Sequence, residues 1–304
     1  MKDNCLTKII WRRFKEFIAP DANRFELLKQ IIEEAALDCK VLELADHCHF
    51  FILPPRGDTS KLETPKAEKA PHAGRTILVA HYDRCAGSPG ANDNSAGVFL
   101  LLETAMKLKV SAAKNWLVIF TDKEELHCGQ SIVEQGAYKL AQELKQLGTA
   151  AQIFCFDACG TGDTLVISTT AEHLLKKEGN GKNLQRSVKA LQMLAHNTAI
   201  NLGMEKVLLA PTPFSDDAGF LRAGLAAQTI TMLPAAECAH LVAELHKSPD
   251  LAGALINAEL RQTCRAHAIP ETWRNLNGPR DSLLRLTPQH FRAVIRFAQA
   301  LCGG

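Results

Sequence analysis

Short, largely apolar runs alternate with longer amphipathic stretches along most of this chain. The apolar runs are bounded by turn-forming or polar residues and cover residues 76–80, 116–120, 153–156, 165–168 and 226–233. Runs of this length are typical of strands that are buried on both faces. The stretches that follow a helical pattern lie near residues 96–107, 131–144, 183–202, 236–265 and 288–302.

This alternation predicts an α/β fold. Buried strands that alternate with helices favour a central sheet, mostly parallel but mixed, with helices on both faces. No internal repeat is visible. We therefore predict one domain over residues 1–304, with residues 75–302 as its core.

The segment before residue 75 has a different pattern. Residues 21–38 carry an apolar stripe at helical spacing, and Asp21 or Asn23 can cap the start of this helix. Residues 41–53 alternate loosely, as a strand does, until two prolines stop the pattern. Residues 55–74 are rich in Lys, Glu, Pro, Gly and Thr and are predicted to be an exposed loop.

Composition excludes some classes of function. Hydrophobic residues make up 46% of the chain, charged residues 22%, and the net charge is +2, so no nucleic-acid groove or membrane-surface patch is expected. No apolar run suits a signal peptide or a membrane span, which makes the cytoplasm the expected location. The ten cysteines are scattered without a CxxC pair, which favours free thiols over a disulfide framework.

Acidic and imidazole side chains follow the predicted strands or lie in the glycine-rich loop after the first of them. They are His81, Asp83, Asp93, Glu124, Glu125 and Asp157. Ligands of open α/β sheets bind outside the carboxyl ends of the strands, so these side chains should meet at one edge. Carboxylates gathered there would repel one another unless a cation compensates them. Zinc accepts both imidazole and carboxylate ligands, and two metal ions bridged by one carboxylate would offset still more charge.

Each residue alone has a plainer interpretation. Asp93 precedes a helix and would serve as its cap, while His81 alone suits a hydrogen-bonded loop histidine. The set as a whole favours a metal site.

The order of these motifs resembles the co-catalytic zinc aminopeptidases of family M28, to which glutaminyl cyclases are distantly related. The resemblance rests on His81-Tyr82-Asp83, the loop 90–97 (GANDNSAG), Glu124-Glu125 and Asp157. Residues 215–220 (SDDAGF) also resemble a later SDHxxF stretch of the family. The likeness covers residues 75–302 and implies a zinc-exopeptidase fold and a peptide substrate.

The resemblance also implies a role for each residue. His81 and Asp157 would bind one zinc, Glu125 a second, and Asp93 would bridge them. Glu124 would be the general base for a metal-activated water that hydrolyses N-terminal peptide bonds. Asp83 would hold the other ring nitrogen of His81.

One expected ligand is absent. The family has a histidine before its last helix, and the matching position in residues 276–286 is Asn277. Another histidine could substitute (His240, His246 or His267), or a single zinc could bind. The alternatives to a peptidase are a degenerate relative that binds peptides without cleaving them and a mononuclear acyltransferase of the glutaminyl cyclase type.

Overall fold

The fold is given by a computed structural model of the 304-residue chain. The structure describes residues 8–44, 46–55, 75–111, 113–127, 129–146, 151–172, 175, 181–248, 250–256 and 266–303. Residues 56–74 of the predicted loop therefore lie outside the described residues.

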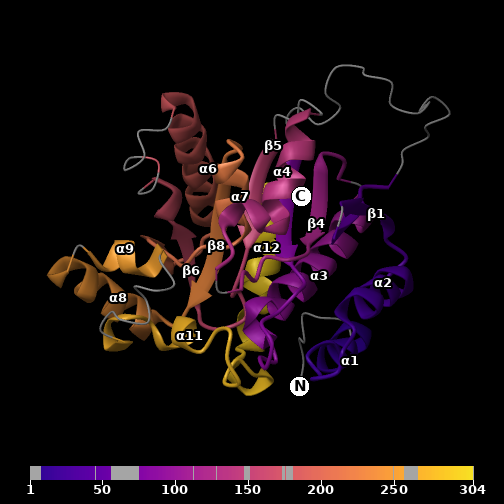
Figure 1. The fold of residues 1–304 in the computed structure, drawn as a ribbon, viewed down its shortest axis with the longest axis horizontal. Helices are drawn as coiled ribbons and strands as arrows, with labels where there is room; N and C mark the ends of the chain where they lie inside the picture. The colour runs from indigo at the N-terminus through magenta and orange to yellow at the C-terminus, as the bar shows by residue number, and fades with distance from the viewer. Residues whose placement is uncertain are drawn as a thin grey trace.

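One sheet runs through the centre of the molecule (Figure 1). In chain order its strands are β1 (Asp38–Leu44), β2 (His47–Leu53), β3 (Arg75–His81), β4 (Trp116–Thr121), β5 (Ala151–Phe156), β6 (Thr164–Ser168), β7 (Val207–Ala210) and β8 (Ala227–Leu233). Their spatial order is β1-β2-β4-β3-β5-β8-β6-β7. The pairs β3–β4, β3–β5, β5–β8 and β6–β7 are parallel, whereas β1–β2, β2–β4 and β6–β8 are antiparallel. The sheet is therefore mixed, with a parallel centre.

Helices and short helical turns connect and cover the strands. The helices are α1 (Lys8–Phe17), α2 (Arg24–Glu34), α3 (Gly97–Val110), α4 (Gly136–Gln146), α6 (Lys182–Asn201), α7 (Asp216–Arg222), α8 (Ala235–Lys247), α9 (Leu251–Ile256), α11 (Glu271–Arg274) and α12 (Phe291–Leu301). The turns are η1 (Ala91–Ala96), η2 (Ile132–Glu134), η3 (Ala266–Ala268), η4 (Leu283–Arg285) and η5 (Pro288–His290). None of these described helices is both long and apolar enough to cross a membrane.

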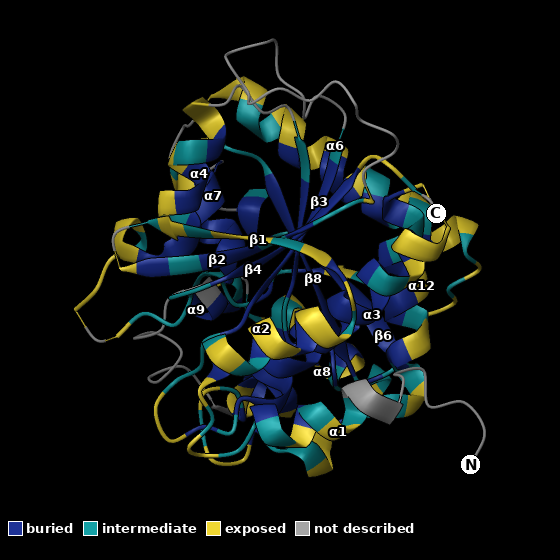
Figure 2. Ribbon diagram, turned by 90° about the vertical axis from the view of Figure 1, so that its right-hand side faces the viewer, coloured by how far each residue is buried: buried dark blue, intermediate teal, exposed yellow. Residues whose placement is uncertain are grey.

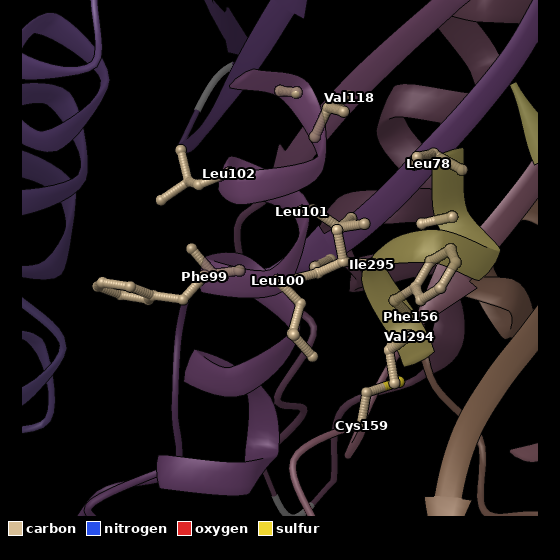
Figure 3. Packing of buried hydrophobic residues seen from close by; sticks show 14 of the residues in the cluster. Leu78, Phe99, Leu100, Leu101, Leu102, Val118, Phe156, Cys159, Val294 and Ile295 are labelled. Carbon is tan, nitrogen blue, oxygen red and sulfur yellow. The ribbon is translucent and has the colours of Figure 1, made fainter. Parts of the chain in front are cut away.

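Successive side chains of the central strands pack into different layers. On β3, Leu78 and Ala80 join the cluster built with α3 and α12, while Ile77 and Val79 join the cluster built with α4. Figure 3 shows the first cluster, with residues of α3 and α12 gathered beside Leu78. The central strands are buried, whereas exposed residues lie on the outer faces of the helices and on the edge strand β1 (Figure 2). These layers confirm the predicted α/β fold.

The N-terminal helices extend the core beyond α3. Phe14 and Phe17 of α1 are fully buried and meet the Phe99 ring edge-on, with ring centroids 4.9 and 5.5 Å apart. Aromatic pairs in this arrangement stabilise a core beyond the effect of burial alone. Helix α1 was not predicted, and its packing places α2 next to the glycine-rich loop.

The predicted strand over residues 41–53 was wrong in one respect. The chain reverses between Leu44 and His47, which face each other across an antiparallel hairpin of β1 and β2. A turn former, Asp46, lies at the reversal. The loose alternation of the sequence came from two strands, each with its own inward face.

The cysteines agree with the prediction where the structure describes them. Cys39, Cys48, Cys85, Cys155, Cys159, Cys238 and Cys302 are free thiols. Cys5, Cys128 and Cys264 lie outside the described residues.

Candidate metal centre

The predicted site residues lie at the carboxyl ends of three neighbouring strands. His81 is the last residue of β3, which pairs with β4 on one side and with β5 on the other. Glu124 and Glu125 follow the end of β4, and Asp157 directly follows β5. Asp93 lies in η1, in the loop between β3 and α3. The parallel centre of the sheet therefore brings these residues to one edge.

The His81 ring stands at the centre of this group and is fully buried. Its Nε2 atom lies 3.1 Å from Asp93 Oδ1, 3.7 Å from Asp157 Oδ1 and 3.9 Å from Glu124 Oε2. Three carboxylates thus converge on one imidazole nitrogen. This arrangement unites residues from three strand ends and one loop, as the sequence predicted.

Asp83 holds the opposite side of the same ring. His81 Nδ1 lies 3.2 Å from Asp83 Oδ1, and the carboxylate also accepts the backbone N–H groups of Glu124 and Glu125 at 3.2 and 3.0 Å. A proton on Nδ1 would satisfy this contact and leave the Nε2 lone pair facing the other carboxylates. Metal-binding histidines commonly have this arrangement of a carboxylate behind the ring.

Several buried polar atoms at the site lack a hydrogen-bond partner. They are His81 Nε2, Glu125 Oε1 and Asp157 Oδ1. Within the described part of the chain, His81, Asp93 and Glu125 form the one group of metal-ligating residue types whose ligand atoms all lie within 4.8 Å of one another. A buried atom without a partner costs free energy. A zinc ion would satisfy both an imidazole nitrogen and carboxylate oxygens, so these residues fit zinc.

The electrostatics of the site also favour a cation. Burial raises the pKa values of Glu124 and Glu125 well above the ordinary range of a glutamate, and neighbouring carboxylates raise both values further. Burial and the charge of Asp157 likewise raise the pKa of Asp93. Burial alone would lower the pKa of His81, but the charge of Glu124 and the three aspartates beside the ring raise it well above its ordinary value. Without a metal ion, therefore, these acids resist ionisation.

More buried acids surround the candidate ligands. Asp216 accepts a hydrogen bond from Thr121 Oγ1 at 2.7 Å, and Asp217 accepts the Ser215 N–H at 3.1 Å. Burial raises the pKa of each of these two aspartates to about 7. Both lie in the stretch whose sequence resembled the later family motif, so that stretch does contribute to the acidic surroundings of the site.

The C-terminal stretch reaches the site through Asp281. Its carboxylate accepts the backbone N–H groups of Asn92 and Asp93 at 2.8 and 3.0 Å. Burial, followed by the charge of Asp93, raises the pKa of Asp281 to about 7. Asp281 thereby anchors the loop that carries the candidate bridging ligand.

Asn277 does not share that position. Its side chain is exposed, and its φ of 61° is left-handed, a conformation that asparagine tolerates better than most residues. The three histidines considered as substitutes are exposed on α8 or η3, where His240 Nε2 lies 2.6 Å from the His267 backbone oxygen. The metal-ligating group found among the described residues includes none of them.

Three residues at the site were not predicted. The Arg24 guanidinium, from α2, donates to backbone oxygens between β3 and the start of the glycine-rich loop and to the Ser95 hydroxyl within that loop. Gln135 Nε2 donates to Glu124 Oε1 at 3.1 Å, and Cys85 Sγ donates to Glu125 Oε2 at 3.2 Å. Only Cys85 had a usable signal, since it lies four positions after His81.

Comparison with known proteins shows which sequence family and which folds the chain resembles. The sequence model of peptidase family M28 matches residues 63–269. A comparison with curated protein sequences gave no significant match. The structure of a zinc aminopeptidase from Bacillus subtilis is similar, with a TM-score of 0.51 and 19% sequence identity. The match covers 84% of this chain but only 48% of the Bacillus subtilis protein.

Two other solved structures match over nearly their whole length. A glutaminyl cyclase from Porphyromonas gingivalis has a TM-score of 0.58 and 15% identity, and the match covers 99% of each chain. A zinc-dependent exopeptidase from Parabacteroides distasonis has a TM-score of 0.60 and 13% identity, covering 96% of this chain and 94% of that one. At these identities the structures share the fold. Because the family's sequence model matches more than half of the residues, this chain belongs to peptidase family M28.

Proposed function

We propose that this chain is a zinc-dependent aminopeptidase that hydrolyses the peptide bond after the N-terminal residue of its substrate. The observation that carries the proposal is the position of the Glu124 carboxylate. One of its oxygens lies 3.9 Å from His81 Nε2, among the candidate ligands, and the other accepts a hydrogen bond from Gln135. A carboxylate that is held next to a metal site without being needed as a ligand suits a general base.

In the proposed roles, His81, Asp93, Glu125 and Asp157 hold the metal. Zinc, when bound, supplies a Lewis acid that polarises a carbonyl and makes water more acidic. Glu124 takes a proton from the attacking water while the water oxygen bonds to the peptide carbonyl carbon. The same carboxyl group then gives that proton to the leaving amine when the C–N bond breaks.

A small hollow lies beside Asp157. It is lined by Asp157, Ala158, Thr212, Pro213, Thr229, Thr231, Trp273 and Leu276. Apart from Asp157, these residues are uncharged. Its volume of about 10 Å³ admits no more than a water molecule, so we propose only that it borders the position of an uncharged substrate side chain.

The experiment that tests the proposal is Glu124→Gln. The glutamine keeps the size of the side chain and an oxygen that can accept the Gln135 hydrogen bond, but it cannot take up the proton. We expect hydrolysis of aminoacyl-peptide substrates to fall by about 10²–10⁴-fold. Zinc content, measured by elemental analysis, should match that of the parent.

The exposed Glu205 provides a matched control, because Glu205→Gln makes the same chemical change far from the motif residues in sequence. This variant should keep full activity. Hydrolysis by the Glu124→Gln protein at the parental rate would refute the role of Glu124.

A second candidate is acyl transfer of the glutaminyl cyclase type, which the whole-length match to the Porphyromonas gingivalis enzyme favours. A peptide with N-terminal glutamine separates the two reactions. Hydrolysis releases free glutamine, whereas cyclisation releases ammonia and leaves a pyroglutamyl peptide of otherwise unchanged length. A protein that binds zinc and peptide but forms neither product would be a peptide-binding relative without catalytic activity.

A further inference from the structure

We propose that the Cys85 thiolate is a ligand of the cation that Glu125 would hold, in the role of the histidine that the sequence lacks. This inference rests on the proposed metal-dependent function and adds a ligand to its site. Cys85 is half-buried, and its Sγ lies 3.2 Å from Glu125 Oε2. A sulfur in direct contact with a candidate ligand is placed to share the same ion.

Buried atoms of the candidate ligands independently indicate a cation. His81 Nε2 is fully buried and has no hydrogen-bond partner, and the second oxygen of Glu125 is likewise buried without one. The ligand atoms of His81, Asp93 and Glu125 lie within 4.8 Å of one another, and Cys85 is joined to this group through Glu125 alone. The Cys85 thiol is the hydrogen-bond donor that occupies the first oxygen of Glu125. A cation between the two side chains would replace that thiol proton.

The other candidate donors lie elsewhere. Asn277 is exposed with a left-handed backbone, and an amide oxygen is a weak ligand for zinc. His240 and His267 contact each other, and His246 is exposed at the end of α8. Within the residues that the structure describes, Cys85 is the thiol that hydrogen-bonds to the carboxylate of a candidate ligand, whereas Cys159 reaches only the backbone oxygens of Asp157 and Ile230.

The chemistry of the exchange is balanced and has a consequence for metal choice. The S–H bond breaks, a sulfur–metal bond forms, and one proton is released to solvent. A bound divalent ion deprotonates a coordinating thiol. Thiolate ligands favour zinc, cobalt and cadmium over magnesium and manganese, so the site should select the softer ions.

The test is the absorption spectrum of the cobalt-substituted full-length protein. The parent should show a sulfur-to-cobalt charge-transfer band, which carboxylate and imidazole ligands do not produce. Cys85→Ser should lose that band and bind zinc at least about tenfold more weakly. Cys39→Ser is the matched control, since Cys39 lies on β1 at the edge of the sheet, and this variant should keep the band.

A second measurement does not depend on a variant that folds. Zinc should protect Cys85 of the parent from alkylation by iodoacetamide, as quantified by peptide mass spectrometry, whereas magnesium should not. A parent that binds cobalt without the charge-transfer band, or whose Cys85 is alkylated equally with and without zinc, would overturn the ligand inference and leave the proposed function intact. A parent that binds neither zinc nor cobalt would overturn both.

Discussion

Asp83 connects two strand ends through a single carboxylate. One oxygen contacts His81 Nδ1 at the end of β3, and the two oxygens together accept the backbone N–H groups of the Glu124-Glu125 pair after β4. Although burial opposes ionisation, the His81 contact and these N–H groups lower the pKa of Asp83 below its ordinary value. The residue therefore stays charged at neutral pH and fixes both the imidazole and the acidic pair.

We predict that Asp83→Asn weakens zinc binding by about 10–100-fold, the usual effect of losing a carboxylate behind a metal-binding histidine. The amide has one acceptor oxygen in place of two, so it cannot satisfy His81 and both N–H groups together. Competition with a chromophoric chelator measures the affinity. The exposed Asp46→Asn variant should bind zinc like the parent. Equal affinity of the Asp83 variant and the parent would remove Asp83 from the metal site.

The sequence identified these residues for a physical reason. His81, Asp83 and Asp157 come at or directly after buried strands, where the parallel sheet determines their position. Gln135 could not be found in this way, because it lies beyond η2 and reaches Glu124 only through the tertiary fold. Unlike Glu124 and Glu125 in the same connection between β4 and α4, Gln135 belongs to no motif that the sequence displays.

At the scale of the elements, α2 braces the loop that carries Asp93. The buried Arg24 side chain donates to the oxygens of Tyr82 and Asp83 after β3, and to those of Pro89 and Gly90 before η1. Its guanidinium also lies 4.7 Å from the centre of the Phe17 ring. Burial lowers the pKa of Arg24 to about 9, so the side chain remains charged at neutral pH. Arg24 also donates to the Ser95 hydroxyl in η1. A helix outside the motif-bearing core thus holds the chain on both sides of Asp93.

We predict that Arg24→Met lowers the free energy of unfolding by at least about 3 kcal/mol, because buried carbonyl oxygens lose their donor. Zinc affinity should fall with it, since the loop loses its brace. Chemical denaturation and chelator competition measure the two effects. Arg12→Met is the control, as the Arg12 side chain is 72% exposed. An Arg24 variant as stable as the parent would show that water replaces the guanidinium without cost.

The elements that the sequence missed had different causes. Strand β7 is short and its residues are mostly half-buried or exposed, so its apolar pattern is weak. Helix α1 is amphipathic, but Arg12 and Arg13 interrupt its apolar run and mask the helical spacing of Phe14 and Phe17. Helix α7 is almost wholly buried despite its two aspartates, and acidic residues next to each other indicate a turn when considered locally. Arg24 was hidden for the same reason, because a charged residue at the start of an amphipathic helix is normally solvated.

At the scale of the whole molecule, the fold concentrates buried acids at one edge of the sheet. Burial raises the pKa of Asp216, Asp217 and Asp281 to about 7, compared with about 3.9 for an unfolded aspartate. Burial also raises the pKa of Glu124 and Glu125. Acids of this kind stabilise the folded chain while they are protonated, and that contribution is lost as the pH rises from about 4 through the folded-state pKa.

The metal-free protein should therefore be most stable in mild acid, and we predict that its melting temperature falls by roughly 5 °C or more between pH 5 and pH 8. Zinc should prevent this fall in melting temperature, because a cation stabilises the ionised carboxylates. The increase in melting temperature on adding zinc should therefore grow with pH. Scanning calorimetry of chelator-treated and zinc-loaded samples checks both statements. Asp217→Asn removes one of the titrating groups and should flatten the metal-free profile, while Asp46→Asn, at an exposed residue, should not. A metal-free protein that melts at a higher temperature at pH 8 than at pH 5 would mean that these acids are solvated in the folded chain, and the electrostatic case for a cation at this edge would fail with them.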